Sequence, residues 1–185
     1  MTESSEITRL LAAVKSGTEG AFDELVGAIY GELERMARSR MVGQPTSFTW
    51  TARDLSHEVF LKLHCADTFL KAENSRFLYG AVSEAMRQLL SDQHRRRNAA
   101  KRRCHKRMIP LDNVLDEIAA NQTSMDAIND ALSILKTRSP RQREVIDLKF
   151  FAGRQVKEIA EILSISPKTV EKDLQVAKAF LRSKL

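Results

Sequence analysis

The chain has 185 residues with a net charge of +6, and 43% of its residues are hydrophobic. This composition suffices for one or two small packed domains, and it excludes a large multi-lobed enzyme and a globally disordered chain. No apolar stretch approaches the roughly eighteen residues of a membrane span, the acidic N-terminus lacks the features of a secretory signal, and the two cysteines are isolated, so we expect a reducing, cytoplasmic setting.

The periodicity of apolar residues predicts an all-α fold. Apolar side chains recur every three or four positions along almost the whole chain, and no alternating run bounded by hairpin turns indicates a strand. The first predicted helix covers residues 7–14 and ends at Gly17, where glycine can take the left-handed conformation. The second covers residues 22–41 and ends before Gly43 and Pro45.

Two further helices are predicted between residues 51 and 97. Thr51, with Asp54 three residues later, resembles a capping box and opens the first of them. The second begins near Ser75 and has the most regular apolar stripe in the chain. We expect the opposite face of this helix to point outward, with its polar residues Arg76, Ser83, Glu84, Arg87, Gln88, Ser91 and Asp92.

One short stretch has a larger net positive charge than the chain as a whole. Residues 92–107 contain eight Lys and Arg residues and a single Asp. Such a density of fixed cations suits a polyanion, because binding releases the counterions that a nucleic acid condenses. A solvated basic segment that binds nothing in particular is the alternative. The stretch follows directly on the helix from Ser75, so we expect a rigid element to present it.

A polar segment without helical periodicity divides the chain. We interpret residues 105–124 as a flexible linker between two small helical domains, residues 1–104 and residues 125–185. In the second domain, Ser139 is suited to be an N-cap, a proline follows at the first helical position, and Gln142 completes a capping box. This run predicts the start of a further helix.

The residues from Val156 onward predict a helix-turn-helix. Apolar residues of 156–163 give one short helix, residues 164–166 give a tight turn, and Pro167 opens a second helix. An ordinary helical hairpin with a solvated face is the alternative. In a helix-turn-helix, the outward positions at the start of the second helix face the major groove, where Lys can bind guanine, Thr a thymine methyl group and Glu a cytosine amino group. Those positions are Lys168, Thr169, Glu171, Lys172 and Gln175.

Several segments together resemble a known family. Residues 140–153, followed by Val-Lys-Glu-Ile-Ala-Glu-Ile-Leu at 156–163, are similar to the C-terminal domain of bacterial RNA polymerase sigma factors. The run Asp-Leu-Ser-His-Glu-Val-Phe-Leu-Lys-Leu at 54–63 resembles the helix with which such factors hold the polymerase clamp. Phe-Leu-Tyr at 77–79, before the arginine-tipped helix, resembles their promoter-melting helix. Two domains with a short linker match the small extracytoplasmic-function (ECF) type, and the resemblance covers residues 6–185.

The resemblance implies a sigma factor that binds core RNA polymerase and directs promoter recognition, DNA melting and transcription initiation, with no cofactor, metal or catalytic residue. The first domain would bind polymerase and the minus-ten promoter element, and the second would recognise the minus-thirty-five element. The implied contacts with polymerase are Asp54, Glu58, Leu61 and Lys62. Those with the minus-ten element are Asn74, where the family captures a flipped-out base, and Arg87, Gln88, Ser91, Asp92, Arg95, Arg96 and Arg97. Those with the minus-thirty-five element are Arg141, Lys168, Thr169, Glu171, Lys172 and Gln175.

Glu84 departs from the family pattern, which usually has Asn or Arg at this position. A carboxylate near DNA repels phosphate unless it accepts a hydrogen bond from a cytosine amino group, so the promoter sequences of the family do not transfer to this chain. Factors of this type are commonly restrained by partners, and an anti-sigma factor is therefore a further candidate partner. Packing of the two domains with their DNA surfaces hidden is a second form of restraint that the sequence leaves open.

Two other classes of function compete with this interpretation. A stand-alone helix-turn-helix regulator accounts for residues 125–185 equally well but leaves the clamp-like and arginine-tipped helices without a role. A metal-dependent enzyme would use His57, His64 and Cys65, but the two histidines are too far apart for the usual chelating pair on one helix, and no further ligand completes the set. The sequence has no phosphate-binding glycine loop and no recognisable nucleophile motif, so we expect no catalysis by this chain alone.

Overall fold

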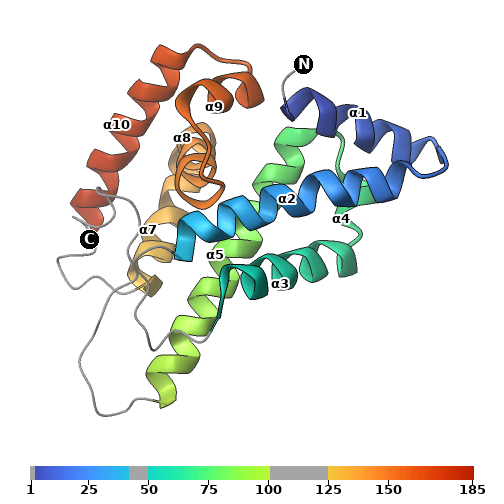
Figure 1. Cartoon of the computed structure of the whole chain (residues 1–185). Coiled ribbons are helices and arrows are strands. Elements are labelled where there is room, and N and C mark those ends of the chain that lie inside the picture. Colours follow the sequence, from blue (N-terminus) through green and yellow to red (C-terminus); the bar gives the residue numbers. More distant parts are fainter. Residues whose placement is uncertain (1–2, 42–49, 101–124) are drawn as a thin grey trace.

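The computed structural model of the chain describes residues 3–41, 50–100 and 125–185. All regular elements in these ranges are helices, which confirms the all-α expectation. None of the described helices is long and apolar enough to cross a membrane. In chain order (Figure 1), the elements are α1 (Glu3–Lys15), α2 (Ala21–Met41), α3 (Ala52–Cys65), α4 (Thr68–Lys71), α5 (Ser75–Ala100), α7 (Met125–Arg138), α8 (Pro140–Ile146), the short π-helix η1 (Asp147–Phe151), α9 (Val156–Leu163) and α10 (Pro167–Lys184).

Local capping signals fix several helix ends as the sequence predicts. Gly17 follows α1 with φ +73°, in the left-handed region that favours glycine. At the start of α3, the Asp54 N–H donates to Thr51 Oγ1 at 3.2 Å and the Thr51 N–H donates to Asp54 Oδ2 at 2.7 Å, so the capping box is confirmed. The Thr51 N–H, together with the Thr51 hydroxyl, which donates to Asp54 Oδ2 at 2.8 Å, lowers the pKa of Asp54, because these hydrogen bonds stabilise the ionised carboxylate.

The predicted capping box at the start of α8 is wrong. Ser139 is the N-cap and Pro140 occupies the first turn, as expected, but the Ser139 side chain makes no capping hydrogen bond. The backbone explains the difference: Ser139 has ψ 90°, whereas the capping residues Thr51 and Ser166 have ψ 169° and 149°. The Ser139 hydroxyl is therefore not aimed at the third N–H of its helix.

The N-terminal helices, α1–α5, bury the apolar stripes that the sequence predicts. Helix α2 contacts α1 and α3, and α5 contacts α1 and α3. Full burial of an aliphatic side chain stabilises the folded chain by about 1.5–3 kcal/mol, so these stripes determine how α3 and α5 are presented. Their buried members include Ile7, Leu11, Leu25, Leu33, Leu55, Val59, Leu78 and Met86.

The C-terminal helices, α7–α10 with η1, contain the predicted helix-turn-helix. Helices α9 and α10 contact each other, and Ser164 makes the tight turn between them with φ 53°. The Thr169 N–H donates to Ser166 Oγ at 3.1 Å, so Ser166 caps α10 as expected. Ala160, Val170 and Leu174 are buried between the helices. The π-helix η1 is unexpected. The Ala152 N–H donates to the carbonyl of Asp147, five residues earlier, at 3.0 Å. Hydrogen bonds with this spacing are rare in proteins overall, but they often occur at functional sites.

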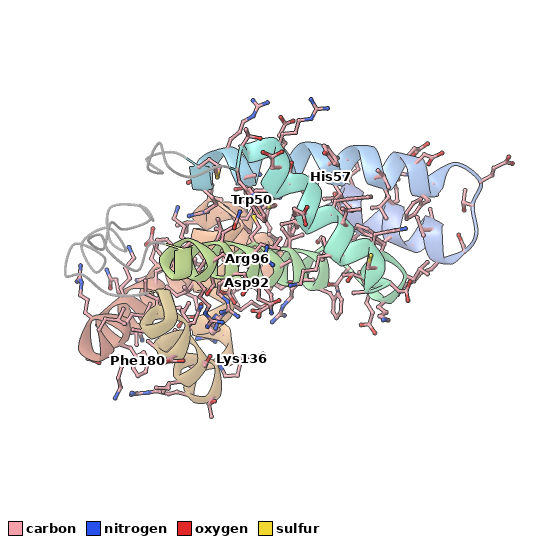
Figure 2. All side chains as sticks on the ribbon, turned by 90° about the horizontal axis from the view of Figure 1, so that it is seen from below. Trp50, His57, Asp92, Arg96, Lys136 and Phe180 are labelled. Carbon is pink, nitrogen blue, oxygen red and sulfur yellow. The ribbon has the colours of Figure 1, made fainter. Side chains whose placement is uncertain are left out.

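Helix α5 joins the two sets of helices. It contacts α3 on one side and η1, α7 and α9 on the other, and Figure 2 shows it between α3, which carries His57, and the C-terminal helices that carry Lys136 and Phe180. Buried apolar side chains of both sets belong to one continuous core. The predicted linker, residues 105–124, lies outside the described residues, as do Gly43 and Pro45. The division of the chain into two domains at that linker stays a prediction.

Candidate polymerase and nucleic-acid interfaces

The residues predicted to contact polymerase share the exposed face of α3. Asp54, Glu58 and Lys62 are exposed, and Leu61 keeps 40% of its surface accessible. The apolar stripe of the same helix, which includes Leu55, is buried. An accessible leucine surrounded by charged side chains suits contact with a partner protein, since interfaces combine an apolar centre with a polar rim.

A layer of aromatic rings lies beside this face. Phe60 contacts Tyr30 of α2 and Phe69 of α4, with ring centroids 6.0 Å and 5.6 Å apart, and His64 stacks on Phe60. His64 is therefore part of an aromatic cluster that fixes α3 on its neighbours. Within residues 3–41, 50–100 and 125–185, no group of three His, Cys, Asp or Glu side chains is placed to hold a metal ion, so His57 and His64 give the metal-enzyme alternative no support.

The C-terminal half of α5 presents part of the predicted basic surface. Asp92, Arg95 and Arg96 are exposed, and Figure 2 shows Asp92 and Arg96 along this helix. The side chain of Arg97 and residues 101–107 lie outside the described residues. The basic stretch thus begins on a continuous helix, as expected.

The sequence predicts that the polar face of α5 points outward, and this is wrong for part of its length. Ser83 and Ser91 are buried and the Arg87 side chain is only 12% exposed, because α7 and η1 pack against α5. Arg87 Nη1 donates to Asn129 Oδ1 at 2.6 Å, and Asn129 Nδ2 donates to Ser91 Oγ at 3.0 Å. Two predicted minus-ten contacts, Arg87 and Ser91, are therefore bound to α7.

Glu84, the residue that departs from the family pattern, connects α5 with α8. Its Oε1 accepts hydrogen bonds from Arg87 and Gln88, and its Oε2 lies 3.7 Å from Arg143 Nη2. Partial burial disfavours the charged form, but the hydrogen bonds and charges of these neighbours outweigh it and lower the pKa of Glu84. The ionised carboxylate holds Arg87 and Gln88 in place.

Asp147 is a second carboxylate at the contact between α5 and the C-terminal helices. Its Oδ2 accepts from Arg143 Nε at 2.8 Å, whereas its buried Oδ1 has no hydrogen-bond partner. Burial raises the pKa of Asp147 to about 6, and the positive charges of Arg143 and Arg87 offset this only in part. This carboxyl group therefore resists ionisation in the packed arrangement.

A groove separates the start of α5 from α7 and α8. It has a volume of about 690 Å³, and its walls include Asn74 and Phe77 on one side and Pro140 on the other. Arg76 bridges the two sides: its Nε and Nη2 donate to the two carboxylate oxygens of Glu144 at 2.7 Å and 2.8 Å. Asn74, where the sequence predicts base capture, is exposed and accepts the Phe77 N–H at 3.0 Å, which caps α5.

Arg154 makes the most buried polar contact between the two sets of helices. Only 2% of its surface is accessible. It donates to Glu32 of α2 and to Glu158 of α9, and its guanidinium lies 4.1 Å from the centre of the Tyr79 ring. Glu32 also accepts hydrogen bonds from Arg35. A buried charge without a partner is costly, and these partners come from both sets, so Arg154 ties the sets together.

The start of α10 remains open in the same arrangement. Its apolar side is buried through Val170, Leu174 and Ala177. The Thr169 side chain is half-buried beside Ser166. The other residues predicted to face the major groove are exposed, namely Lys168, Glu171, Lys172 and Gln175.

Arg141, also predicted to contact the minus-thirty-five element, is bound to α10. Its Nε and Nη2 donate to the two carboxylate oxygens of Asp173 at 2.6 Å and 3.2 Å. Asp173 is buried, while 55% of the Arg141 side chain is accessible. Arg141 therefore holds α10 against α8 and stays within reach of solvent.

Several residues that join the two sets of helices were not predicted from the sequence, namely Glu32, Asn129, Arg143 and Arg154. Glu32 follows the buried Ile29 by three positions, and Arg143 precedes the buried Ile146 by three, so each lies on an otherwise apolar helix face. That pattern is the only signal that could have marked them. Asn129 carries no comparable signal, since its partners Arg87 and Ser91 are far away in the sequence. Arg154 has one local partner, Glu158, four positions later, but its contact with Glu32 spans 122 positions.

Comparison with known proteins adds one match. The chain is similar to the family model described as ECF sigma factor over residues 4–185. No curated protein matches the sequence. The family match spans the exposed face of α3, the whole of α5 and the helix-turn-helix, so it covers every surface described above.

Proposed function

The chain belongs to the ECF sigma factor family, and from this membership we propose that it binds core RNA polymerase and directs promoter recognition, DNA melting and transcription initiation. Members of the family are non-catalytic initiation factors whose partners are core polymerase and promoter DNA. The observation that carries the proposal is the arrangement of α10: its apolar side is buried, its start is capped by Ser166, and its first polar residues are exposed. A recognition helix requires this arrangement.

Polymerase binding is assigned to α3. The proposed contacts are Asp54, Glu58, Leu61 and Lys62, all exposed on one face. The capping box at Thr51 and the aromatic cluster around Phe60 hold this face in a fixed orientation. A rigid face loses little conformational entropy when a partner binds, which favours tight association.

Recognition of the minus-ten element is assigned to α5. Opening a duplex costs about 1–2 kcal/mol of stacking per base-pair step, so a captured single strand requires compensating base contacts and neutralised phosphates. Arg95 and Arg96 are accessible for phosphates, and Asp92 is accessible for bases. Arg97, Asn74, Gln88, Arg87 and Ser91 complete the proposed set, although the last two are covered by α7 in this arrangement.

Recognition of the minus-thirty-five element is assigned to the C-terminal helices. Lys168, Glu171, Lys172 and Gln175 are the exposed candidates for base contacts. Thr169 and Arg141 flank them, and Arg141 also fixes the orientation of α10 through Asp173. In this proposal residues 1–104 and residues 125–185 are separate functional domains, and residues 105–124 link them.

Run-off transcription with purified core polymerase on genomic fragments tests the proposal. Correctly started transcripts that appear only when the chain is added support it, and they also identify the promoter. Failure to start transcription on any template refutes it.

A stand-alone regulator is the second candidate, because residues 125–185 suit DNA binding without polymerase. Binding of core polymerase separates the two functions. A sigma factor must bind core polymerase through α3, whereas a regulator must bind promoter DNA without retaining polymerase in a pull-down.

A further inference from the structure

We propose that the surface of α7 and α8 that packs on α5 imitates promoter DNA, so that α5 binds either this surface or a single DNA strand. The inference rests on the proposed assignment of α5 to the minus-ten element. It gives the contact between the two sets of helices a function: the chain supplies its own competitor for the strand-binding face.

The first element of the imitation is a carboxylate in place of a phosphate. Glu144 of α8 accepts two parallel hydrogen bonds from Arg76 of α5, at 2.7 Å and 2.8 Å. Carboxylate and phosphate present paired oxygens to a guanidinium in the same planar geometry, which is why arginine binds both groups in this bidentate way. While Glu144 occupies Arg76, that arginine cannot make the same contact with a DNA phosphate.

The second element is a carboxamide in place of a base edge. Asn129 of α7 accepts from Arg87 through Oδ1 and donates to Ser91 through Nδ2. The orientation of this amide is determined by Arg87, which can only donate. An acceptor beside a donor is the pattern that a DNA base offers to protein side chains. Both α5 residues in this network are among the proposed minus-ten contacts.

The contact leaves no room for a strand along this part of α5. The Arg87 side chain is 12% exposed and Ser91 is 4% exposed, so DNA can reach them only if α7 moves away. The place proposed for the flipped-out base, beside Asn74 and Phe77, forms a groove whose opposite wall includes Pro140 of α8. The C-terminal helices therefore cover the base-reading residues Arg87 and Ser91 and border the base-capture site, where Asn74 stays exposed.

The other two proposed surfaces are not obstructed. Glu58 and Leu61 on α3 and Lys168 and Lys172 on α10 are exposed in the same arrangement. The packed chain can therefore bind polymerase and duplex DNA before α5 is released. Only strand capture requires the two sets of helices to separate, and this prevents the free protein from binding unrelated single strands.

Two substitutions on the C-terminal helices test the proposal without changing any residue of α5. The double variant Asn129→Ala, Glu144→Gln removes both imitating groups. The probe is a fluorescein-labelled 20-nucleotide single-stranded DNA of random sequence, and its binding to the free full-length chain is measured by fluorescence anisotropy. We expect the variant to bind the probe about tenfold more tightly than the wild type, because a larger fraction of molecules has α5 available.

The matched control is Ser133→Ala, Glu161→Gln. It removes one polar side chain from α7 and one negative charge from α9, both at exposed positions, so it corrects for the change in net charge. We expect its affinity for the probe to stay within about twofold of the wild type, since surface substitutions have small effects. Equal affinities of the test variant and the control variant overturn the proposal.

A distance measurement provides a second, independent readout. Spin labels on Cys65 of α3 and on a Val176→Cys substitution in α10, with Cys104→Ser to avoid a third label, report the separation of the two sets of helices. Both labelled positions are exposed. We expect one short distance in the wild type and an added long-distance population in the double variant. A wild type that already shows the long population refutes the packed free form. Neither readout contains polymerase, so a failure of run-off transcription is distinguishable from a failure of this inference.

Discussion

The guanidinium of Arg154 lies over the ring of Tyr79, 4.1 Å from its centre, and connects the segment before α9 with α5. The same guanidinium is bound to Glu32 of α2 and Glu158 of α9. The pair is a polar contact inside the protein, with Arg154 and Tyr79 each 2% exposed. Cation–π contact of this kind is strongest when water is excluded, so this contact is a principal determinant of how the two sets of helices are held.

We expect Arg154→Met to lower the free energy of unfolding by about 3 kcal/mol, because it leaves Glu32 buried with fewer partners and removes the contact with Tyr79. Urea unfolding followed by circular dichroism measures the change. Arg53→Met, at an exposed position on α3, is the control and should change the free energy by less than about 0.5 kcal/mol. Equal effects of the two substitutions would show that Arg154 does not stabilise the packed form.

The raised pKa of Asp147 predicts an unusual dependence of stability on pH. The value is about 6 in the folded chain and 3.8 for an ordinary Asp. Between these values the folded chain binds more protons at this site than the unfolded chain, so the contribution to stability is complete below the lower value and is lost as the pH rises through about 6. Acidification from pH 7 to pH 5 should therefore stabilise the folded chain through this residue. The full contribution, about 3 kcal/mol, is reached only when the pH falls below the lower value.

Asp147→Asn tests this prediction, because the amide stays neutral and can still accept the hydrogen bond from Arg143. We expect the variant to be more stable than the wild type at pH 7 and to lose the gain on acidification. Urea unfolding at pH 5 and pH 7 measures both effects. Asp130→Asn, at an exposed position on α7, should keep the wild-type dependence on pH. If Asp147→Asn also keeps it, the carboxyl group is ionised throughout this range.

Glu58→Arg should abolish binding of core RNA polymerase while leaving the fold intact, because Glu58 is exposed on α3 and the substitution reverses its charge. Pull-down of purified core polymerase measures binding, and circular dichroism checks the helices. Glu19→Arg makes the same change of charge at an exposed position between α1 and α2 and should bind polymerase normally. Retention of polymerase by Glu58→Arg would remove α3 from the polymerase interface.

Lys172→Ala should weaken binding to the minus-thirty-five half of the cognate promoter by about 1–3 kcal/mol and relax the choice of base at one position, as expected for a side chain that reads a base edge. Fluorescence anisotropy with a duplex and its single-base variants measures both effects. Lys15→Ala, exposed on α1, controls for the loss of one positive charge. An even loss of affinity over all duplexes would instead assign Lys172 to a phosphate.

The sequence by itself determined the local structure and the family. Helix periodicity, the capping pair Thr51 and Asp54, and the turn before Ser166 involve residues within a few positions of one another, so their outcome depends little on the rest of the chain. The helix-turn-helix of α9 and α10 and the exposed face of α3 followed from the same local patterns. The sequence patterns did not predict the four-residue helix α4 or the π-helix η1, because the conformation of such short elements depends on their neighbours more than on their own residues.

Only the tertiary structure decided which polar faces meet water and which meet protein. Arg87 and Ser91 look like residues of a solvated helix face in the sequence, yet both are bound to Asn129, which lies far along the chain. A polar face that is covered by a complementary polar surface has the same residue pattern as one that is covered by water, since both satisfy its hydrogen bonds. The burial of Arg154 depends in the same way on Glu32 of α2 and Tyr79 of α5, which are distant in the sequence, whereas its partner Glu158 of α9 is only four positions away.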